Sequence, residues 1–358
     1  MEKLLSIIIP TYNMEQLLPR CLDSLVSAVN NDLLEVMVVN DGSKDESLRV
    51  ANEYKERYPN VVNVIDKPNG NYGSTINAAL PLVKGKYVKI LDADDWFDTR
   101  ELEHLLDEMA NVNVDLIVTH FTQLEPGGRW QLVKYNTMGR EVYEYGRVYN
   151  LDDVLKDGYI RFFLMHAIAW RTQMLRDMGY RQTEGISYTD TEWASVPVYV
   201  AQTIVFFPLN VYQYNMDREG QTMDPKVLMK SVRQLDRVFA GLLEFYRTYD
   251  KAQLSEIRKN FIRQYLANRV RILYKIYLLD MPRKDFEPKE LEELDARYRK
   301  WIEELDLDVR LYPENKLLRI DYVKYWHKYG KRWPVWLEWI NKKVDVVVKG
   351  LYVILFRH

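Results

Sequence analysis

The chain has 358 residues, which is enough for two or three domains with sizeable cores. Its 50 lysines and arginines nearly balance its 52 aspartates and glutamates, so it lacks the overall basic field typical of nucleic-acid-binding proteins. The single cysteine, Cys21, excludes an internal disulfide framework and a cysteine-rich zinc site. Because the N-terminus also lacks the long apolar stretch of a secretory signal, we expect a reducing, cytoplasmic compartment.

The first 120 residues alternate short apolar runs with helical patterns, which predicts βαβ units and a mostly parallel sheet. Apolar residues recur at three- and four-residue spacing from Met14 to Val26. We therefore expect an amphipathic helix there, with Pro19 at its start and Cys21 in its buried stripe. The expected strands are Leu4–Ile9, Glu35–Val39, Val61–Ile65, Tyr87–Leu91 and Val114–Thr119.

The pattern changes twice further along the chain. Residues 121–224 are interrupted by glycines and rich in aromatic residues, so we expect them to shape the acceptor-binding half of the domain that residues 1–120 begin. Helical periodicity starts at Pro225 and continues to about Met281, and a second helical block follows. The sequence thus predicts an α/β domain followed by a helical region, 225–358.

A cluster of carboxylates directly follows the buried strand that ends near Leu91, namely Asp92, Asp94 and Asp95. Acids in this position lie where open α/β sheets bind their ligands. Their like charges repel one another unless a cation lies among them, and a hard divalent cation with oxygen ligands is the natural partner. The alternative is an acidic turn before a helix, and Asp98 and Thr99 can cap that helix alone. On the cluster by itself, the two interpretations are evenly matched.

Two further polar clusters end strands at the same expected edge of the sheet. The first strand runs into Pro10-Thr11-Tyr12, where the aromatic ring can stack on a nucleobase. The second runs into Asn40-Asp41-Gly42-Ser43, where Asp41 can accept a hydrogen bond from a base. A plain turn with a helix cap explains the second cluster equally simply and is favoured when that cluster is taken alone.

Taken in order, the motifs at 6–13, 38–45 and 85–95 resemble those of the family 2 glycosyltransferases of the bacterial cell-surface polysaccharide type. The resemblance continues more weakly to about residue 225. It implies a GT-A nucleotide-diphospho-sugar transferase fold, with a mostly parallel, Rossmann-like sheet. It also implies a metal-dependent, inverting enzyme, hexosyltransferase-like, that moves a sugar from a nucleotide-sugar donor, most often UDP-linked, to a hydroxyl of a saccharide or lipid-linked acceptor.

The resemblance assigns roles to individual residues. Asp95 is implied as the ligand of Mg²⁺ or Mn²⁺, with Asp94 beside it. Asp190 stands where the family has its catalytic base, and Arg218 lies in a segment that folds over the diphosphate in related enzymes. The implied nucleotide-binding residues are Pro10, Thr11, Tyr12, Asp41, Lys67, Asn77, Asp92, Ala93 and Asp94.

Departures from the family pattern keep other interpretations open. Asn40, Ile76 and Thr189 replace an acid, an arginine and a glutamate that the family often carries, which is compatible with an inactive nucleotide-binding or scaffolding relative. A nucleotidyltransferase is a weaker alternative, because the chain lacks a Gly-rich phosphate loop after its first strand.

Single residues of the expected site also have simpler interpretations. Asp190 or Thr189 can equally serve to cap the helix that begins there, and Glu192, two residues further on, would point away from Asp190. Lys67 is readily explained as a solvated surface lysine. His166, within an apolar run, is more typical of a core residue than of an acceptor contact.

The C-terminal segment Lys316–His358 mixes four tryptophans with many lysines, which suits an amphipathic segment at the inner face of an anionic membrane. A helical cap packed on the domain or on a partner explains the composition equally well. The stretch Val344–Phe356 is apolar but too short to span a bilayer. Neither the sugar nor the acceptor can be determined from the sequence.

Overall fold

The computed structural model describes residues 2–125, 127–134, 141–216, 227, 229, 231–312, 320–340 and 343–344. The chain divides into two compact units. Unit 1 comprises 1–221 and 250–261, and unit 2 comprises 222–249 and 262–358. The segment 250–261, which lies inside the predicted helical region, thus groups with the α/β part of the chain.

Unit 1 is built on one ten-stranded sheet. The five strands expected from the sequence are all present. The aromatic-rich half adds four more, and the fifth additional strand, β5, follows the acid cluster. The strands are β1 (Leu5–Thr11), β2 (Leu34–Asp41), β3 (Val62–Lys67), β4 (Tyr87–Ile90), β5 (Trp96–Phe97), β6 (Leu116–Glu125), β7 (Arg129–Val133), β8 (Val148–Asn150), β9 (Ile168–Arg171) and β10 (Thr203–Asn215).

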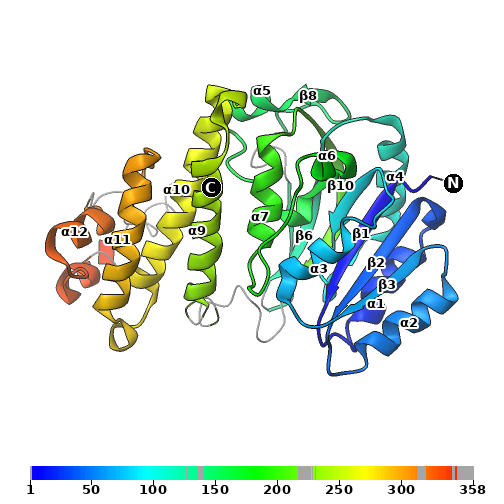
Figure 1. Ribbon diagram of the computed structural model, residues 1–358, viewed down its shortest axis with the longest axis horizontal. Coiled ribbons are helices and arrows are strands. Elements are labelled where there is room, and N and C mark those ends of the chain that lie inside the picture. Colours follow the sequence, from blue (N-terminus) through cyan, green and yellow to red (C-terminus); the bar gives the residue numbers. More distant parts are fainter. Residues whose placement is uncertain are drawn as a thin grey trace, which may run out of the picture. The chain divides into compact units, whose positions relative to one another are not determined.

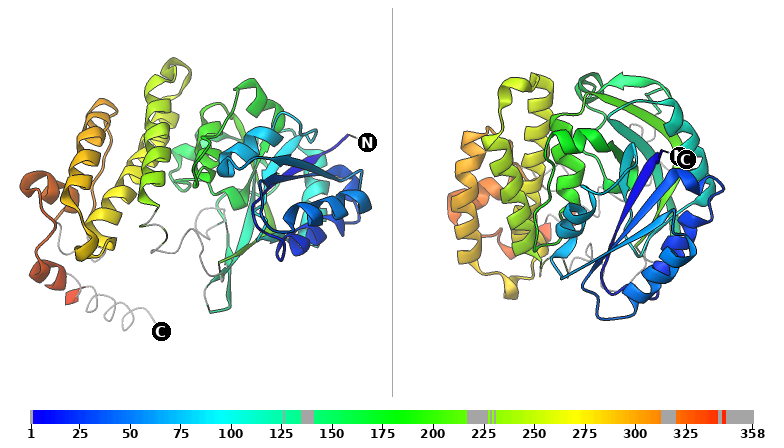
Figure 2. Two further views of the ribbon diagram at one scale, coloured as in Figure 1. Left: turned by 60° about the horizontal axis from the view of Figure 1, so that its bottom comes forward. Right: turned by 45° about the vertical axis from the view of Figure 1, so that its right-hand side comes forward.

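The strand order along the sheet is β3-β2-β1-β4-β9-β6-β10-β5 (Figure 1). Strands β1 to β4 are parallel, as predicted. Strand β9 is antiparallel to both β4 and β6, so β6 and its parallel neighbour β10 run in the same direction as β4. Strands β7 and β8 extend the sheet as antiparallel partners of β6 and β10. Figure 2 shows the twist of this sheet from two further directions.

Helices connect the strands of unit 1. The first helix begins at Leu18 rather than near Met14, with Pro19 in its first turn, where the missing N–H costs nothing. Cys21 is fully buried in this helix, as expected. Asp98 caps α4 by accepting from the backbone N–H groups of Arg100 and Glu101. The helices are α1 (Leu18–Val26), α2 (Ser47–Arg57), α3 (Asn71–Ala79), α4 (Thr99–Asn111), α5 (Leu151–Lys156), α6 (Thr172–Asp177) and α7 (Asp190–Ser195).

Lys89 in β4 is a buried cation in the core of unit 1. Its ammonium group donates to the carbonyl oxygens of His166 (2.7 Å) and Ile168 (3.0 Å). Burial lowers the pKa of Lys89 to about 7. These two hydrogen bonds fix the 3₁₀ turn Met165–Ala167 against the strand that leads into the acid cluster.

Unit 2 is helical, with α9 (Val232–Thr248), most of α10 (Glu256–Lys275), α11 (Pro288–Glu304) and α12 (Tyr322–Tyr329). Two buried or half-buried acids tie these helices together. Asp236 in α9 pairs with Arg297 of α11 at 2.7 Å. Asp295 in α11 accepts from the Tyr274 hydroxyl of α10 and pairs with the His327 ring of α12 at 2.8 Å.

The tryptophans near the C-terminus do not share one environment. Trp326 and Trp333 are buried within unit 2, and Trp333 stacks on Tyr322 with ring centroids 3.9 Å apart. Trp336 and Trp339 are exposed. Among the described residues, no helix is both long and apolar enough to cross a bilayer. Pro225 and most of Val344–Phe356 lie outside the described residues.

Candidate active site

The three polar strand ends predicted from the sequence meet at one edge of the sheet. Strand β1 lies between β2 and β4, and all three run in parallel. In register, Thr11 is opposite Asn40, and Asp41 is opposite Lys67. Because the carboxyl ends of parallel strands share an edge, the segments that follow β1, β2 and β4 come together there.

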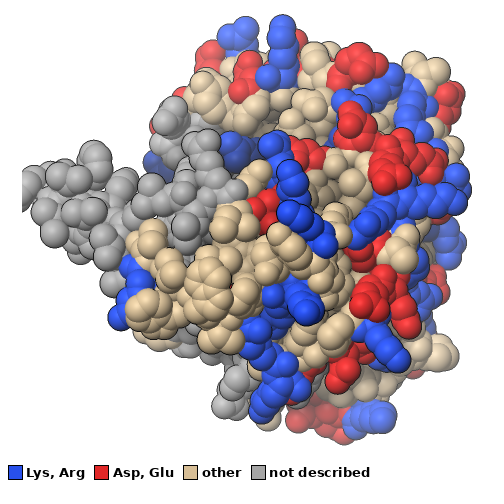
Figure 3. Space-filling model, turned by 90° about the vertical axis from the view of Figure 1, so that its left-hand side faces the viewer, with Lys and Arg blue, Asp and Glu red and all other residues tan. Residues whose placement is uncertain are grey.

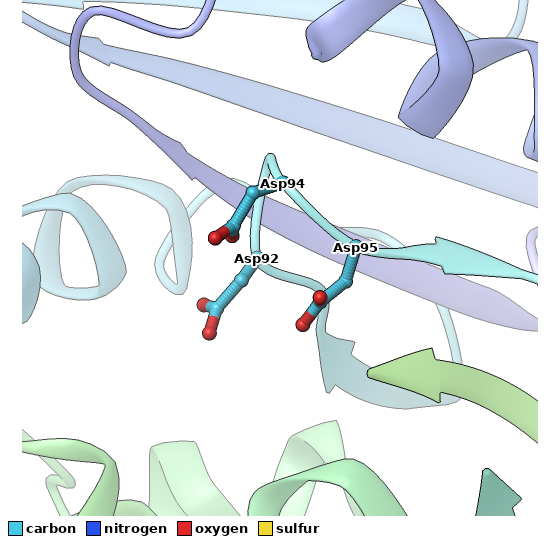
Figure 4. Close-up of side chains that lie close together, drawn as sticks. All are labelled: Asp92, Asp94 and Asp95. Atoms are coloured by element: carbon cyan, nitrogen blue, oxygen red, sulfur yellow. The ribbon is translucent and has the colours of Figure 1, made fainter. Parts of the chain in front are cut away.

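The acid cluster forms a tight group in the turn after β4 (Figure 4). Carboxylate oxygens of Asp92, Asp94 and Asp95 all lie within 4.8 Å of one another. Asp95 is buried, whereas Asp92 and Asp94 are partly exposed. The backbone N–H of Asp95 donates to the carbonyl of Asp92 (3.0 Å), which closes the turn.

Asp95 is held from strand β10. The Tyr212 hydroxyl donates to Asp95 Oδ2 at 2.6 Å, and the backbone N–H of Asn215 donates to Oδ1 at 2.7 Å. Burial raises the pKa of Asp95 well above its usual range, and the nearby charges of Asp94 and Asp92 raise it further. The two donors to Asp95 therefore offset the effects of burial and of charge repulsion only in part.

Asp92 is held from helix α3. The Tyr72 hydroxyl donates to Asp92 Oδ1 at 2.8 Å. Burial raises the pKa of Tyr72, and the charges of Asp92 and Asp190 add to the effect. The Tyr214 hydroxyl shows the same pattern: its pKa is raised by burial, then by Asp95, Asp92 and Asp190. Asp190 therefore lies within electrostatic reach of the same two hydroxyls as the acid cluster.

The segments after β1 and β2 are cross-linked. The backbone N–H of Asn13 donates to Ser43 Oγ (3.0 Å), and that of Lys44 donates to Asn13 Oδ1 (2.8 Å). Asn13 has φ 55°, a left-handed conformation that asparagine tolerates well. Thr11 is buried, but Tyr12 is 42% exposed, so its ring is accessible to a ligand at this edge.

Lys67 is an ion-pair partner and not a solvated surface lysine. Its ammonium group donates to Asp41 Oδ1 (2.6 Å), to the carbonyl of Pro68 (2.6 Å) and to Ser74 Oγ (2.8 Å). These three bonds use all three of its donors. Asp41 Oδ1 also accepts from the backbone N–H of Gly70 at 2.9 Å. Lys67 therefore fixes the carboxylate of Asp41 at the N-terminus of α3.

Asn77 joins α3 to the segment that precedes Asp190. Its side chain accepts from the backbone N–H of Gln182 and donates to the carbonyl of Gln182, both at 2.8 Å. It also donates to Glu184 Oε1 at 2.8 Å. These bonds occupy the amide, so Asn77 contributes to the site chiefly by holding this segment in place.

Glu192 holds the same segment from the other side. Its two carboxylate oxygens accept from the backbone N–H (2.7 Å) and the hydroxyl (2.6 Å) of Thr183. Glu192 is therefore engaged away from the cluster, in agreement with its position two residues beyond Asp190.

Asp190 is the first residue of α7. Thr189 occupies the N-cap position, but its side chain makes no capping hydrogen bond, and its buried hydroxyl oxygen has no hydrogen-bond partner among the described residues. The preceding residue, Tyr188, has φ 69°, so the chain turns sharply into the helix. The capping alternative raised by the sequence thus does not describe the Thr189 side chain.

His166 packs among aromatic rings, as is typical of a core residue. Its ring stacks on Tyr214 with centroids 4.3 Å apart and meets the edge of Tyr212 at 4.8 Å. Burial lowers the pKa of His166 to about 3, with a smaller effect from Lys89. The neutral ring thus supports the two tyrosines that border the acid cluster.

Arg218 lies outside the described residues. Another arginine, Arg20 in α1, reaches the cluster: it donates to the carbonyl of Asp94 at 3.1 Å, and its guanidinium lies 3.6 Å from the centroid of the Trp96 ring. The sequence prediction missed Arg20. The available signal was its position in the helix that follows β1, at the edge where the ligand is expected.

Residues 6–178 match the model of the family described as glycosyl transferase family 2. This segment, just under half of the chain, is therefore similar to glycosyltransferase family 2. The matched residues contain the three strand ends and the acid cluster, so the resemblance predicted from the motifs is confirmed. Asp190 and the β10 residues Tyr212 and Asn215 lie beyond the matched segment.

Curated relatives carry similar segments. Over 101 residues, the family 2 segment is 41% identical to the poly(ribitol-phosphate) beta-glucosyltransferase of Bacillus spizizenii, covering 27% of this chain and 16% of that protein. The chain spans between 16% and 39% of the length of this and other such relatives. The chain is therefore similar to one part of each relative and not to the whole protein.

Solved structures resemble the chain over a greater length. Residues 1–349 of TarS from S. aureus match with a TM-score of 0.60 and 19% identity, covering 85% of this chain and 82% of that one. TarS has also been solved in complex with UDP-GlcNAc. The mannosyltransferase PcManGT from Pyrobaculum calidifontis, in complex with GDP-Man and Mn²⁺, matches with a TM-score of 0.53 and 16% identity, covering 100% of this chain and 89% of that one. At these identities the likeness shows the fold, and the predicted GT-A fold is confirmed.

Proposed function

We propose that this protein is a metal-dependent, inverting glycosyltransferase that transfers a sugar from a nucleotide-sugar donor to a hydroxyl group of an acceptor. One observation carries the proposal. The acid cluster and Asp190 act electrostatically on the hydroxyls of the same two tyrosines, Tyr72 and Tyr214. This supports a site for the leaving diphosphate and a carboxylate base for the acceptor close to each other.

The donor nucleotide would bind at the edge formed by β1, β2 and β4. The exposed ring of Tyr12 offers a stacking surface for the base, and Thr11 and the anchored carboxylate of Asp41 offer polar contacts beside it. Pro10 and Ala93 shape the backbone near the ligand, and Asp92 and Asp94 lie toward the ribose and diphosphate. UDP is the proposed carrier because TarS, which shares the fold, binds UDP-GlcNAc.

The acid cluster fits a hard divalent cation. Its donors are carboxylate oxygens within 4.8 Å of one another, which is the ligand chemistry that Mg²⁺ and Mn²⁺ prefer. The raised pKa of Asp95 reflects burial and repulsion from Asp94 and Asp92, which a cation would relieve. We assign Asp95 and Asp94 as its ligands. When bound, the cation would neutralise the charge that develops on the departing nucleoside diphosphate.

Asp190 is the proposed general base. Its carboxylate would remove the proton from the acceptor hydroxyl as that oxygen attacks the anomeric carbon from the face opposite the diphosphate. One such displacement inverts the anomeric configuration, so an α-linked donor would yield a β-glycoside. Arg20, which is held beside Asp94, and Arg218, which the family resemblance implies, are proposed to meet the phosphate oxygens.

The acceptor is proposed to be a saccharide or a lipid-linked saccharide of a cell-surface polysaccharide. The support is the similarity to the poly(ribitol-phosphate) beta-glucosyltransferase of Bacillus spizizenii. Such synthesis would place this protein in the cytoplasm, at or near the inner face of the membrane.

The proposal is tested by measuring UDP release and sugar transfer from a panel of nucleotide sugars with Mn²⁺, using Asp190→Asn and Asp95→Asn. Asp190→Asn should bind donor and Mn²⁺ normally but transfer sugar about 10²–10⁴-fold more slowly, because only the base is lost. Asp95→Asn should weaken Mn²⁺-dependent donor binding itself. The exposed Asp153 provides a matched control, and Asp153→Asn should leave both properties unchanged.

Two results would contradict the proposal. Transfer that is unaffected in Asp190→Asn would remove the base from its assigned role. Metal-dependent nucleotide binding without turnover across a broad donor and acceptor panel would instead support an inactive, nucleotide-binding relative.

A further inference from the structure

Unit 2 presents a group of exposed aromatic and apolar side chains close to its last described residues. Val335, Trp336 and Trp339 are 64%, 63% and 60% exposed, and Tyr329 is half exposed. Together with Lys328, Lys331 and Lys343, we call these residues the tryptophan surface. Figure 3 views the protein from the side of α11 and α12 and shows an uncharged area edged by lysines and arginines.

The tryptophan surface is held in place by buried contacts beneath it. Residues 335–340 form a short helix whose inner side carries Leu337, which is buried, and Glu338. Glu338 pairs with Arg283 at 2.6 Å, and the carbonyl of Trp333 accepts from the same arginine. Helical spacing then directs residues 335, 336 and 339 outward. Their exposure is thus a consequence of how this helix is anchored.

The described ionic side chains of this surface are lysines. Lys328 Nζ lies 5.0 Å from the Tyr329 ring centroid, and Lys343 Nζ lies 5.6 Å from the Trp339 ring centroid. Lys331 is exposed at the start of the same stretch. The acid Glu338 pairs with Arg283 and Arg332. Among the described residues, the exposed rings of the tryptophan surface therefore lie beside cationic groups.

We infer that the tryptophan surface binds the headgroup region of a membrane that contains anionic phospholipid. Indole rings partition into this region because one part of the ring is apolar and the N–H is polar. Lysines beside them meet lipid phosphates and carboxylates. The inference extends the proposed location of the enzyme to a named surface, and it can be tested without measuring glycosyl transfer.

The positive charge of the tryptophan surface makes a second copy of the chain an unfavourable binding partner for it. A symmetric dimer through this surface would bring the lysines of one copy close to those of the other, and like charges at an interface are unfavourable. An anionic membrane, by contrast, matches both the rings and the charges of the surface.

The test uses the full chain and sedimentation with two kinds of vesicle, phosphatidylcholine alone and phosphatidylcholine mixed with phosphatidylglycerol. The wild-type chain should bind the mixed vesicles more tightly, and added salt should weaken that binding. Trp336→Ala/Trp339→Ala should reduce binding to the mixed vesicles by at least about tenfold. Lys328→Gln/Lys331→Gln/Lys343→Gln should lose on the order of a hundredfold, since each lysine near an anionic surface contributes about fivefold.

Matched controls come from unit 1. Among the described tryptophans, Trp130 is also exposed, so Trp130→Ala controls for the loss of an exposed indole. The exposed lysines Lys55, Lys84 and Lys156 control for the loss of three charges when changed to Gln. Both control variants should bind vesicles like the wild type. Because the outward side chains make few contacts, thermal unfolding of the test variants should be unchanged.

Three outcomes would overturn the inference. The first is a wild-type chain that does not prefer anionic vesicles. The second is a tryptophan variant that binds them as well as the wild type does. The third is a Trp130→Ala control that loses as much binding as Trp336→Ala/Trp339→Ala. A concentration-dependent dimer that Trp336→Ala/Trp339→Ala dissociates would identify a subunit interface instead. Asp190→Asn should bind vesicles normally, so failure of membrane binding and failure of the proposed catalysis are distinguishable.

Discussion

The Tyr212 hydroxyl donates a hydrogen bond of 2.6 Å to Asp95 Oδ2 and accepts one of 3.2 Å from the backbone N–H of Asp92. A single buried side chain on β10 thus holds both ends of the turn that carries the acid cluster. Residues 92 and 212 are 120 positions apart, so this contact depends on the pairing of β10 within the sheet. The position of the candidate metal ligand is therefore set by the second half of the domain.

Removing this hydroxyl should loosen the cluster. Tyr212→Phe keeps the ring but takes a donor from Asp95, so we expect Mn²⁺ affinity in the presence of UDP to fall by about 10–100-fold. Titration of Mn²⁺ followed by calorimetry measures this affinity. Tyr143→Phe is the control. The Tyr143 hydroxyl donates a hydrogen bond of 3.1 Å to Asp157, which is not part of the acid cluster. Equal Mn²⁺ affinity in Tyr212→Phe and wild type would show that the hydroxyl does not position Asp95.

The acid cluster could be predicted from the sequence because it follows directly on a run of buried strand residues. Both the strand and the acids are local features, and the parallel pairing of β1, β2 and β4 follows from the alternation of strands and helices. The tyrosines that hold the cluster could not be predicted in the same way. Tyr72 lies in a segment rich in glycine and asparagine and Tyr212 in an aromatic-rich strand, and only the tertiary fold brings both to the cluster.

Lys67 illustrates the same limit. A lone lysine after a strand is usually solvated, and nothing in its local sequence indicates that it meets Asp41 from the neighbouring strand. The parallel register of β2 and β3 places them opposite each other. Trp326 and Trp333 differ from Trp336 and Trp339 for a similar reason, since composition counts tryptophans but does not say which of them are buried.

Breaking the Asp41–Lys67 pair should affect both stability and donor binding. Lys67→Met leaves the buried carboxylate of Asp41 without its cation, and we expect a loss of about 1–3 kcal/mol in the free energy of unfolding. UDP affinity should fall as well, because Asp41 is the proposed contact of the base. Chemical denaturation and UDP titration measure the two effects.

The control for this change is Lys259→Met. Lys259 pairs at 2.7 Å with Glu256, whose side chain is exposed, so loss of this pair should cost no more than about 0.5 kcal/mol. If Lys67→Met and Lys259→Met behave alike, the Asp41–Lys67 pair contributes nothing specific to the site.

Gly73 should control the approach of Asp190 to the donor side. A Cβ atom at this position would lie 2.1 Å from the carbonyl oxygen of Thr183, in the segment that leads to Asp190. Gly73→Ala must therefore push this segment away from α3, at a cost of about 1–3 kcal/mol in stability. We expect the rate of sugar transfer to fall more than UDP affinity does, because the displacement affects the base.

Gly241→Ala provides a matched control. A Cβ atom at Gly241 would have open space around it, and the residue lies in the middle of α9. The change should raise stability by about 0.5–1 kcal/mol, as alanine is the better helix former, and leave transfer unaffected. Wild-type transfer rates in Gly73→Ala would contradict a role for this close packing.

His166 should make the protein less stable in mild acid. Burial lowers its pKa to about 3 in the folded chain, whereas the unfolded chain binds the proton with the ordinary pKa of about 6.5. The unfolded state therefore gains protons first as the pH falls, and stability decreases from about pH 6.5 down to about pH 3. Between about pH 7 and about pH 5, the loss in the free energy of unfolding should be at most about 2 kcal/mol. Because the His166 residue is partly exposed, solvent should reduce this loss.

His166→Phe isolates this contribution, because a phenyl ring can keep the stacking on Tyr214 but does not titrate. The variant should lose less stability than the wild type when urea unfolding is compared at the two pH values. His104, which is exposed on α4, serves as the control, and His104→Gln should retain the wild-type pH dependence. If His166→Phe and wild type lose the same stability on acidification, the His166 ring does not resist protonation. The interpretation that Tyr212 and Tyr214 pack against a neutral imidazole would then be wrong.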